Sequence, residues 1–419
     1  MPGSQIPVPM SDILSPPLQS KPQVTSPSTT KRLLSLDALR GFDMFWIVGG
    51  EELVHALYNA WPNGPLGIIN SQMDHKVWQG VAFYDLIFPL FVFIVGVSLV
   101  FSLTKAIEVN GKAAALKRVF FRSLLLYVFG LLIYGGISKG IDGIRWMGVL
   151  QRIAICYFST SLVFCFFKLR GMIVAAAALL LTYWALMTFV PFPDVRPASA
   201  SPQEITKHNG FTNVAQLNLS STTMLHGQFI PGVNLANYVD QKYLPGYKWD
   251  GTYDPEGLLS TLPAIVTCLL GVFAGLLLRN PNVPDQKKVL LLAGAGIAGV
   301  ALGFLWGLEF PVIKKLWTSS YVLVAGGYAC IFLAAFYQVI EIWQWRRWCT
   351  PFVWIGMNPI SIYLAFHFVS FEKLANLLVG GPVAAAFGSF GPVVVTLTIV
   401  LLMFAFVRFL YNRKIFLRL

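Results

Sequence analysis

The sequence predicts an all-α, polytopic membrane helix bundle, and its composition and its repeated apolar runs are the observations that predict it. Of the 419 residues, 56% are hydrophobic and only 12% are charged, whereas about a quarter of the residues of a soluble protein are charged. The mean hydropathy is +0.65. Apolar runs of about 20 residues, the length at which a helix crosses a bilayer, recur from one end of the chain to the other.

The net charge of +12 does not indicate a nucleic-acid partner, because of where the basic residues lie. They form short clusters between the apolar runs, which is how the cytoplasmic loops of membrane proteins are marked. The five cysteines lie within apolar segments or at their edges, so neither a disulfide framework nor a metal-ligand spacing follows from them. We therefore expect the lipid bilayer as a partner, and neither nucleic acid nor a metal.

Residues 1–30 are rich in Pro, Ser, Thr and Gln and lack apolar periodicity, so we expect a disordered cytoplasmic tail. They also lack the basic, apolar and small-residue pattern of a cleaved signal peptide. The remainder, 31–419, is predicted to be a single transmembrane domain. Its ten predicted spans are roughly 36–57, 84–104, 119–137, 147–167, 171–190, 257–278, 287–307, 318–340, 350–370 and 391–411.

The distribution of lysine and arginine predicts the orientation. With the N-terminus in the cytoplasm, most basic clusters fall on the inner side, and residues 191–256 form a long outer, periplasmic loop. Residues 371–390 are too rich in Gly and Pro for a span, so we expect a surface or re-entrant piece. An eleventh crossing there is the alternative, but it would place Arg413, Lys414 and Arg418 outside. We expect a multi-pass protein of the bacterial inner membrane with both ends cytoplasmic.

The stretch Met73–Ser98 is the strongest candidate for chemistry. It begins with the polar residues Asp74, His75 and Lys76 and continues as an apolar helix whose first turn carries Asp85. Imidazole titrates near neutral pH, so a histidine at the mouth of a membrane helix with carboxylates nearby suits acid–base catalysis. The alternative is that His75 is an interfacial loop residue and that Asp85 only caps the following helix.

Other polar and ionisable residues gather at the same predicted level as His75. They are Glu51, Glu52, His55, Arg145, Gln151, Arg152, Asp254, Glu256 and His367. Arg152 has an alternative role as a buried ion-pair partner of Glu51 or Asp85. The segment Met357–Pro359 is expected to break or kink the ninth helix, because proline removes a backbone donor. This break either shapes a cavity or only adjusts packing.

The first span is predicted to carry one polar stripe, because several of its residues fall within an arc of roughly 60° at about 100° per residue. These residues are Asp37, Arg40, Met44, Val48, Glu51 and His55. A charge that faces lipid at mid-depth costs at least ~2.5 kcal/mol, so the stripe should face the interior of the bundle. The alternative for Asp37 and Arg40 is that they only pair with each other, three residues apart.

The long outer loop interleaves aromatic residues with amides and carboxylates. They are Asn234, Asn237, Tyr238, Asp240, Tyr243, Tyr247, Trp249, Asp250 and Tyr253. This mixture suits a sugar, which presents apolar C–H faces and many hydroxyl groups. The alternative is a loop that packs over the bundle and meets the lipid interface with its aromatic rings, and we expect a combined role.

Several motifs resemble those of a known family. Ser35–Gly41 (SLDALRG) looks like the opening S-[LV]-D-x-[FL]-R-G motif of the heparan-α-glucosaminide N-acetyltransferase family and its bacterial homologues. His75–Gly80 (HKVWQG), followed by Asp85–Gly96 (DLIFPLFVFIVG), resembles that family's H-x-x-W-x-G…D-L-[VI]-F-P-x-F-V-F-I-x-G. Later blocks match in order, at Gly148–Arg152, Tyr253–Gly257, Leu316–Tyr321 and Gly356–Asn358. The ordered set covers nearly everything from residue 32 onward.

This resemblance implies a transmembrane acetyltransferase, which takes acetyl from cytosolic acetyl-CoA and places it on an amino-sugar nitrogen across the membrane. It also implies that His75 corresponds to the active-site histidine of the family. The family has a functional asparagine ten residues after the glycine of its R-G pair, whereas counting ten from Gly41 leads here to Glu51. A carboxylate cannot donate a hydrogen bond unless it is protonated. At this position the chain departs from the family pattern.

Acetyl transfer from a thioester to an amine or a hydroxyl needs a base, a polarised carbonyl and a dry cavity. His75 suits the role of the base or of a transient acyl carrier. A carboxylate would orient its ring and stabilise the imidazolium. The candidate carboxylates are Glu51, Asp74 and Asp85. Arg152 or the Asn358 amide would stabilise the oxyanion.

The remaining expected contacts concern the two substrates. The CoA phosphates are expected at the cytoplasmic face, where the candidates are Lys117, Arg118, Arg122, Arg346 and Arg347, and Asn358 is a further candidate for binding the co-substrate. The pantetheine arm would then climb about half of a ~30 Å hydrocarbon core to approach His75. The residues expected to bind the acceptor are Trp78, Trp249, Asp254, Glu256 and His367. A homodimer is compatible with the sequence.

Two other functions are compatible with the sequence. One is a membrane O-acyltransferase of the kind that begins with a similar L-D-x-L-R-G motif, whose acceptor would be a glycan hydroxyl. The other is a non-catalytic transporter or flippase, for which an interrupted helix and a polar interior are equally expected. Transfer of labelled acetyl by the purified protein would separate the enzymes from the transporter.

Overall fold

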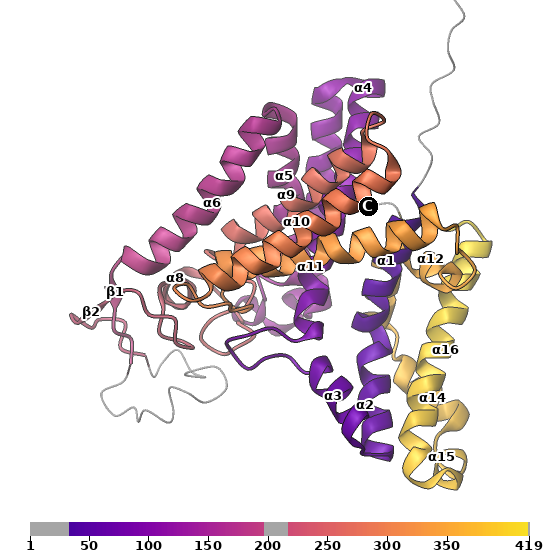
Figure 1. The fold of residues 1–419 in the computed structure, drawn as a ribbon. Coiled ribbons are helices and arrows are strands. Elements are labelled where there is room, and N and C mark those ends of the chain that lie inside the picture. The colour runs from indigo at the N-terminus through magenta and orange to yellow at the C-terminus, as the bar shows by residue number, and fades with distance from the viewer. Residues whose placement is uncertain (1–32, 197–216, 418–419) are drawn as a thin grey trace, which may run out of the picture. The chain divides into compact units, whose positions relative to one another are not determined.

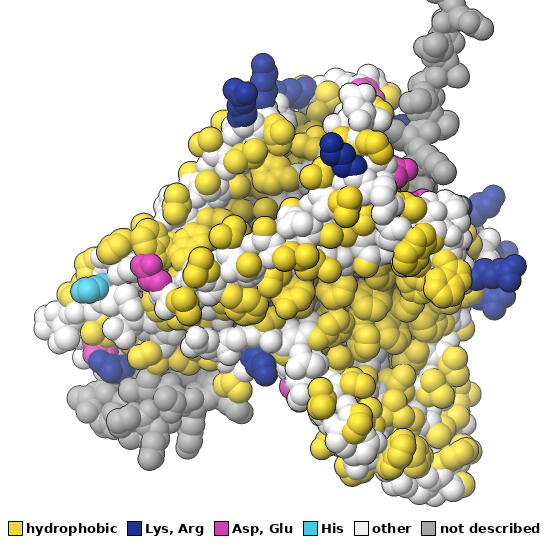
Figure 2. All heavy atoms as spheres, in the orientation of Figure 1, with side chains coloured by type: hydrophobic (Ala, Val, Ile, Leu, Met, Phe, Trp, Pro, Cys, Tyr) yellow, Lys and Arg dark blue, Asp and Glu magenta, His cyan; other side chains and the backbone are white. Residues whose placement is uncertain are grey.

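The computed structural model describes residues 33–196 and 217–417, which form helices with almost no sheet (Figure 1). The strands in this part of the chain are β1 (Phe192–Pro193) and β2 (Met224–Leu225), which pair antiparallel. Apolar side chains cover much of the face seen in Figure 2, as expected of helices that meet lipid. The prediction of an all-α polytopic membrane bundle is confirmed. The predicted tail, 1–30, lies outside the described residues.

Seven described helical segments are long and apolar enough to cross a membrane by length and composition, or eight if one bent pair is a single span. They are Phe83–Ser138, Val149–Phe166, Leu169–Phe189, Thr261–Arg279, Asp285–Trp306, Ser319–Ile342 and Gly388–Asn412. The predicted number of ten differs for two reasons. The predicted spans 84–104 and 119–137 fall within one long segment that is interrupted at Gly111, and the predicted spans 36–57 and 350–370 are each broken into shorter helices.

The first predicted span consists of two helices in series, α1 (Leu34–Phe45) and α2 (Glu51–Ala60), joined by the π-helical turn η1 (Trp46–Gly50). Gly49 permits this break, because its φ of +156° and ψ of −10° lie in a region that L side chains rarely adopt. The first span is therefore a helix with a built-in interruption.

The predicted polar stripe faces the interior along its first half. Its buried members are Asp37, Met44 and Val48. Beyond the π-helical turn the side chains of His55 and Glu51 are 27% and 29% exposed, so the stripe is only partly covered there.

The predicted pairing of Asp37 with Arg40 is confirmed, with 3.4 Å between Oδ1 and Nη1. The same guanidinium donates to the Gly356 carbonyl at 3.0 Å and to the Ser98 hydroxyl at 2.6 Å. Arg40 therefore ties three separate parts of the chain together, which is more than a local pair provides.

The longest helix, α4 (Ile87–Ile133), contains a break at Gly111, where φ is +78° and ψ is +166°. Its first half packs closely against α9 (Thr261–Arg279), as Figure 1 shows. A Cβ atom added at Gly96 or at Gly271 would lie 1.9 Å from a backbone carbonyl oxygen of the other helix. Small residues let membrane helices approach this closely, so these two glycines fix the α4–α9 contact.

The ninth predicted span is broken at Asn358, as expected from the proline that follows it. α12 (Thr350–Met357) ends and α13 (Pro359–Phe368) begins on either side, and Asn358 has φ −132° and ψ 43°. Asn358 is fully buried, and its side-chain oxygen and nitrogen have no hydrogen-bond partner among the described residues. α12 packs tightly on α1, since a Cβ at Gly356 would lie 1.8 Å from the Asp37 carbonyl oxygen.

Residues 371–390 form short helices rather than a straight eleventh span. α14 (Phe371–Val379) is bent by 69° from α13, and α15 (Pro382–Ala386) follows it. Both pack against α16 (Gly391–Asn412), the last helix. This arrangement agrees with the expected surface or re-entrant piece.

The described part of the outer loop packs over the bundle through an apolar core that it shares with residues 183–187 and 310–316. The buried residues of this core are Tyr183, Met187, Phe192, Val195, Val233, Leu235, Ala236, Tyr238, Phe310, Ile313 and Leu316. Within the loop, α8 (Leu235–Tyr243) begins at Asn234, whose side chain accepts from the Asn237 backbone N–H. The Trp78 indole donates to the Phe229 carbonyl at 2.6 Å, so this loop is tied to the segment that carries His75.

The carboxylate of Asp240 in α8 is buried beneath the loop. It accepts from the backbone N–H groups of Leu258 at 2.9 Å and Asp254 at 3.4 Å. Burial nevertheless raises the pKa of Asp240 to about 7, and the nearby Asp254 charge acts in the same direction.

We expect the protein to lose stability as the pH rises from about 4 to about 7, because folding favours protonated Asp240. The stability that protonated Asp240 contributes is fully present below the pKa of this carboxyl in the unfolded chain, and it is lost as the pH rises through its pKa in the folded protein. The unfolding midpoint in detergent should be about 5 °C lower at pH 8 than at pH 5, and Asp240→Asn should remove much of that difference. The control is Asp142→Asn, at an exposed site, which should leave the difference unchanged. An unchanged pH dependence in Asp240→Asn contradicts the prediction.

Candidate active site

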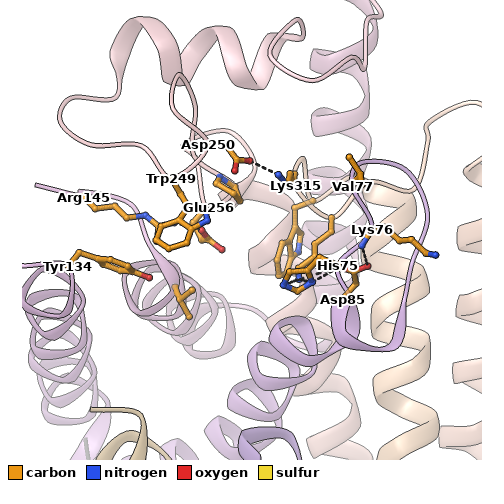
Figure 3. A pocket seen from close by; sticks show the side chains of 14 residues that line it. His75, Lys76, Val77, Asp85, Tyr134, Arg145, Trp249, Asp250, Glu256 and Lys315 are labelled. Carbon is orange, nitrogen blue, oxygen red and sulfur yellow. Dashed lines mark hydrogen bonds and ion pairs between the residues drawn. The ribbon is translucent and has the colours of Figure 1, made fainter. Parts of the chain in front are cut away.

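His75 lies in the loop that leads into α4 and pairs with Asp85 (Figure 3). The distance from His75 Nδ1 to Asp85 Oδ1 is 2.8 Å, and the side chains are 52% and 1% exposed, respectively. An ionised carboxylate only accepts hydrogen bonds, so Nδ1 carries the proton. The second ring nitrogen, Nε2, then has the basic lone pair.

The Asp85 carboxylate is held in place by several donors besides His75. The backbone N–H groups of Lys76 and Ala82 donate to Oδ2 at 3.1 and 3.0 Å. The ammonium group of Lys314 lies 3.3 Å from Oδ1. Asp85 therefore caps the turn that begins the helix and also contacts His75. The two alternatives considered for Asp85, a helix cap and a partner of His75, are both seen.

Lys314 is the third member of this cluster. It comes from the loop between α10 (Asp285–Trp306) and α11 (Ser319–Tyr337), and its Nζ lies 3.0 Å from His75 Nδ1 and 3.4 Å from Nε2. Burial lowers the pKa of Lys314, while the Asp85 carboxylate opposes this shift.

These residues line one side of a cavity of about 440 Å³, a size typical of sites for small organic ligands. Figure 3 shows His75 and Lys76 on one side and Tyr134, Arg145 and Trp249 on the other. The two sides come from segments far apart in the sequence, and the outer loop supplies Trp249. The cavity thus combines a base with an aromatic wall.

Arg145 organises the far side of the cavity. Its guanidinium donates two hydrogen bonds to Asp254, at 2.8 and 2.7 Å, and one to Glu256 at 2.7 Å. It also lies between two rings, 4.5 Å from the centroid of Tyr134 and 5.1 Å from that of Trp249. Burial lowers the pKa of Arg145, but the two carboxylates outweigh it, so the guanidinium stays charged. Burial raises the pKa of the Glu256 carboxyl.

A second ion pair lies on the same cavity, between Lys315 Nζ and Asp250 Oδ2 at 2.8 Å. Burial raises the pKa of Asp250, and Lys315 counteracts the shift. This pair links the loop that carries Lys314 to the outer loop, so both parts of the cavity wall are held together.

Arg152 is fully buried behind the cavity. It donates to the Ser260 hydroxyl and lies 4.9 Å from the centroid of the Trp317 ring, which lines the cavity. Its Nε and Nη1 have no hydrogen-bond partner among the described residues. No described carboxylate forms an ion pair with it, so the suggested pairing with Glu51 or Asp85 is not seen.

Glu51 and Asp74 gather around His55 instead of His75. The Nε2 atom of His55 lies 3.6 Å from Glu51 and 3.8 Å from Asp74. Glu51 also interacts with the hydroxyl of Tyr84, whose ring centroid is 4.8 Å from that of His75. Glu51 therefore approaches the imidazole only through Tyr84, and it does not line the cavity.

The other predicted residues lie outside the cavity. His367 Nδ1 bonds the carbonyl of its own helix at Tyr363, at 2.8 Å. Arg122 packs 5.5 Å from the ring centroid of Tyr157. The remaining members of this set are Trp78, Lys117, Arg118, Asp254, Arg346, Arg347 and Asn358. Among the residues that the structure describes, no group of three His, Cys, Asp or Glu side chains is placed to hold a metal ion.

Three cavity residues were not singled out from the sequence as site candidates: Lys314, Lys315 and Tyr134. A signal for the lysines was present. The two adjacent lysines lie on the predicted outer side, where basic residues are depleted, and directly precede the motif at Leu316–Tyr321.

The chain is similar to proteins of one known family. The family model described as heparan-alpha-glucosaminide N-acetyltransferase, catalytic, matches residues 32–214. The heparan-alpha-glucosaminide N-acetyltransferase of Mus musculus is 28% identical over 327 residues, and that of Homo sapiens is 29% identical over 326 residues. Each alignment covers 69% of this chain and 48% of the relative, so the chain spans about half the length of these curated relatives. The predicted resemblance of this chain to the heparan-α-glucosaminide N-acetyltransferase family is therefore confirmed.

Proposed function

We propose that this chain is a transmembrane acyltransferase that moves an acetyl group from cytosolic acetyl-CoA to an amino sugar or another glycan acceptor at the outer face. The observation that carries the proposal is the His75–Asp85 pair, which presents an imidazole Nε2 beside a cavity of about 440 Å³. The family resemblance supplies the reaction class. The N-terminus would lie in the cytoplasm of a bacterium, and the outer loop in the periplasm.

In the proposed reaction the acceptor nitrogen attacks the thioester carbonyl carbon. The new C–N bond forms as the C–S bond breaks, and His75 Nε2 takes the proton from the nitrogen and returns it to the departing sulfur. Asp85 holds Nδ1–H and stabilises the imidazolium between these two transfers. Lys314, 3.4 Å from Nε2, is the cation nearest to the developing oxyanion.

The far side of the cavity suits the acceptor. The Trp249 ring, backed by the Arg145 guanidinium, offers a flat apolar surface for the C–H face of a sugar. Glu256 lines the same cavity and accepts hydrogen bonds from hydroxyl or ammonium groups. Asp254 positions Arg145 and thereby the ring.

Basic residues on α4 and the buried Asn358 amide are the proposed contacts for acetyl-CoA. Lys117 and Arg118 are exposed on the second half of α4 and are available to CoA phosphates, with Arg122 nearby. The Asn358 amide, buried and without a partner among the described residues, is suited to an oxyanion or to the pantetheine amides.

We expect purified protein in liposomes to transfer labelled acetyl from acetyl-CoA to glucosamine, whereas empty liposomes should not. Alkaline hydroxylamine cleaves an ester and leaves an amide, so resistance of the product identifies a nitrogen acceptor and lability identifies a hydroxyl acceptor. Absence of transfer to any amino sugar or glycan, together with uptake of a solute into the liposomes, contradicts the proposal and favours the transporter.

A further inference from the structure

A second cavity, of about 770 Å³, lies between α2, α14, α15 and α16, and none of its lining residues lines the His75 cavity. Its size is within the range of about 300–1,000 Å³ found for organic ligands. Figure 1 places these helices together at one end of the bundle, and Figure 2 shows much apolar surface over them.

The walls of this cavity are mostly apolar, with two carboxylates. Val395 and Ile399 of α16 and Phe366 of α13 contribute apolar surface, and Glu52 and Glu372 contribute the charges. No residue that lines the cavity is basic. Neither glutamate forms an ion pair or a side-chain hydrogen bond within the part of the chain that the structure describes.

The location of the cavity points to lipid. Only 22% of the most apolar window of α16 is buried within the protein, so this helix presents most of its surface to the bilayer. Glu52 and Glu372 are both exposed, so their charges are available to a cation from outside the described chain. A molecule that supplies this cation and also has apolar chains would fit both the carboxylates and the α16 side.

We propose that this cavity is a binding site for a zwitterionic phospholipid, whose headgroup ammonium lies between Glu52 and Glu372 and whose chains lie along α16. A primary ammonium group donates three hydrogen bonds to the two carboxylates. Lys373, exposed next to Glu372, is available to the phosphate of the same lipid. The proposal does not depend on acetyl transfer at His75.

The test reconstitutes the full chain with equal amounts of phosphatidylethanolamine, phosphatidylcholine and phosphatidylglycerol of identical chains, and then measures the lipids retained after mild detergent extraction by native mass spectrometry. We expect the two zwitterionic lipids, whose headgroups carry an ammonium group, to be retained about fivefold over the anionic phosphatidylglycerol, the effect of two partly exposed ion pairs. A larger share of the ethanolamine lipid than of the choline lipid would identify the N–H donors as part of the site.

The double variant Glu52→Gln, Glu372→Gln should lose this preference, and Ala385→Trp should lower retention by filling the cavity. The matched control is Glu309→Gln, an exposed and unpaired glutamate outside the cavity, which should behave as wild type. Equal retention of all three lipids by wild type, absence of retained lipid, or an unchanged preference in the double variant would each overturn the proposal. Unchanged thermal unfolding of the variants shows that they are folded.

Discussion

The variant His75→Ala is expected to transfer acetyl at least about 10³-fold more slowly than wild type, the size of effect usual for a general base or nucleophile. The reason is geometric. Asp85 holds Nδ1 at 2.8 Å, so Nε2 is the basic atom available at the cavity, and among the described histidines His75 alone lines it. The measurement is kcat/KM for labelled acetyl-CoA with the acceptor in excess.

His55→Ala is the matched control for this variant. His55 is also flanked by two carboxylates, Glu51 and Asp74, but it does not line the cavity, so its removal should change the rate by less than about threefold. Equal rates for His75→Ala and wild type would exclude a catalytic role for His75. A single turnover without acceptor shows whether His75 acts as a general base or as a transient acyl carrier, because only an acyl carrier would retain label on the protein.

The sequence was sufficient for those features that depend on local pattern. Apolar runs predicted the bundle, and the proline after Asn358 predicted the break between α12 and α13. These features are set within about ten residues of chain, where spacing alone limits the geometry.

The rest of the site depends on contacts between distant segments. Lys314 meets His75 across 239 residues, and Arg145 meets Asp254 across 109 residues. Periodicity contains no information on such pairs. Carboxylates also compete for partners. The sequence left the partner of His75 open among Glu51, Asp74 and Asp85, and the structure places Glu51 and Asp74 against His55 instead.

The count of spans shows a further limit. Hydropathy predicts how much apolar chain is available, but it does not reveal where a helix is interrupted. Gly49, within the predicted span 36–57, has a positive φ that breaks the helical path. A glycine within an apolar run is common, so the sequence alone does not distinguish Gly49 from the glycines that pack helices together, such as Gly96.

The variant Asp85→Asn is expected to lower kcat by about 10²–10⁴-fold with little change in the affinity for acetyl-CoA. An asparagine amide would donate to Nδ1 of His75, which would move the proton to Nε2 and leave the cavity without a basic nitrogen. The Lys314 ammonium would also lose the carboxylate 3.3 Å away, so the positive charge beside the ring would disfavour the imidazolium further.

Asp74→Asn is the matched control, because it removes a carboxylate from the residue directly before His75. The Asp74 side chain is 64% exposed and lies 3.8 Å from His55, so the loss of its charge should change kcat by less than about threefold. Similar losses in both variants would mean that the net charge near the cavity matters and the tautomer of His75 does not. A selective loss in Asp85→Asn, with unchanged thermal unfolding, would identify Asp85 as the residue that fixes which ring nitrogen is the base.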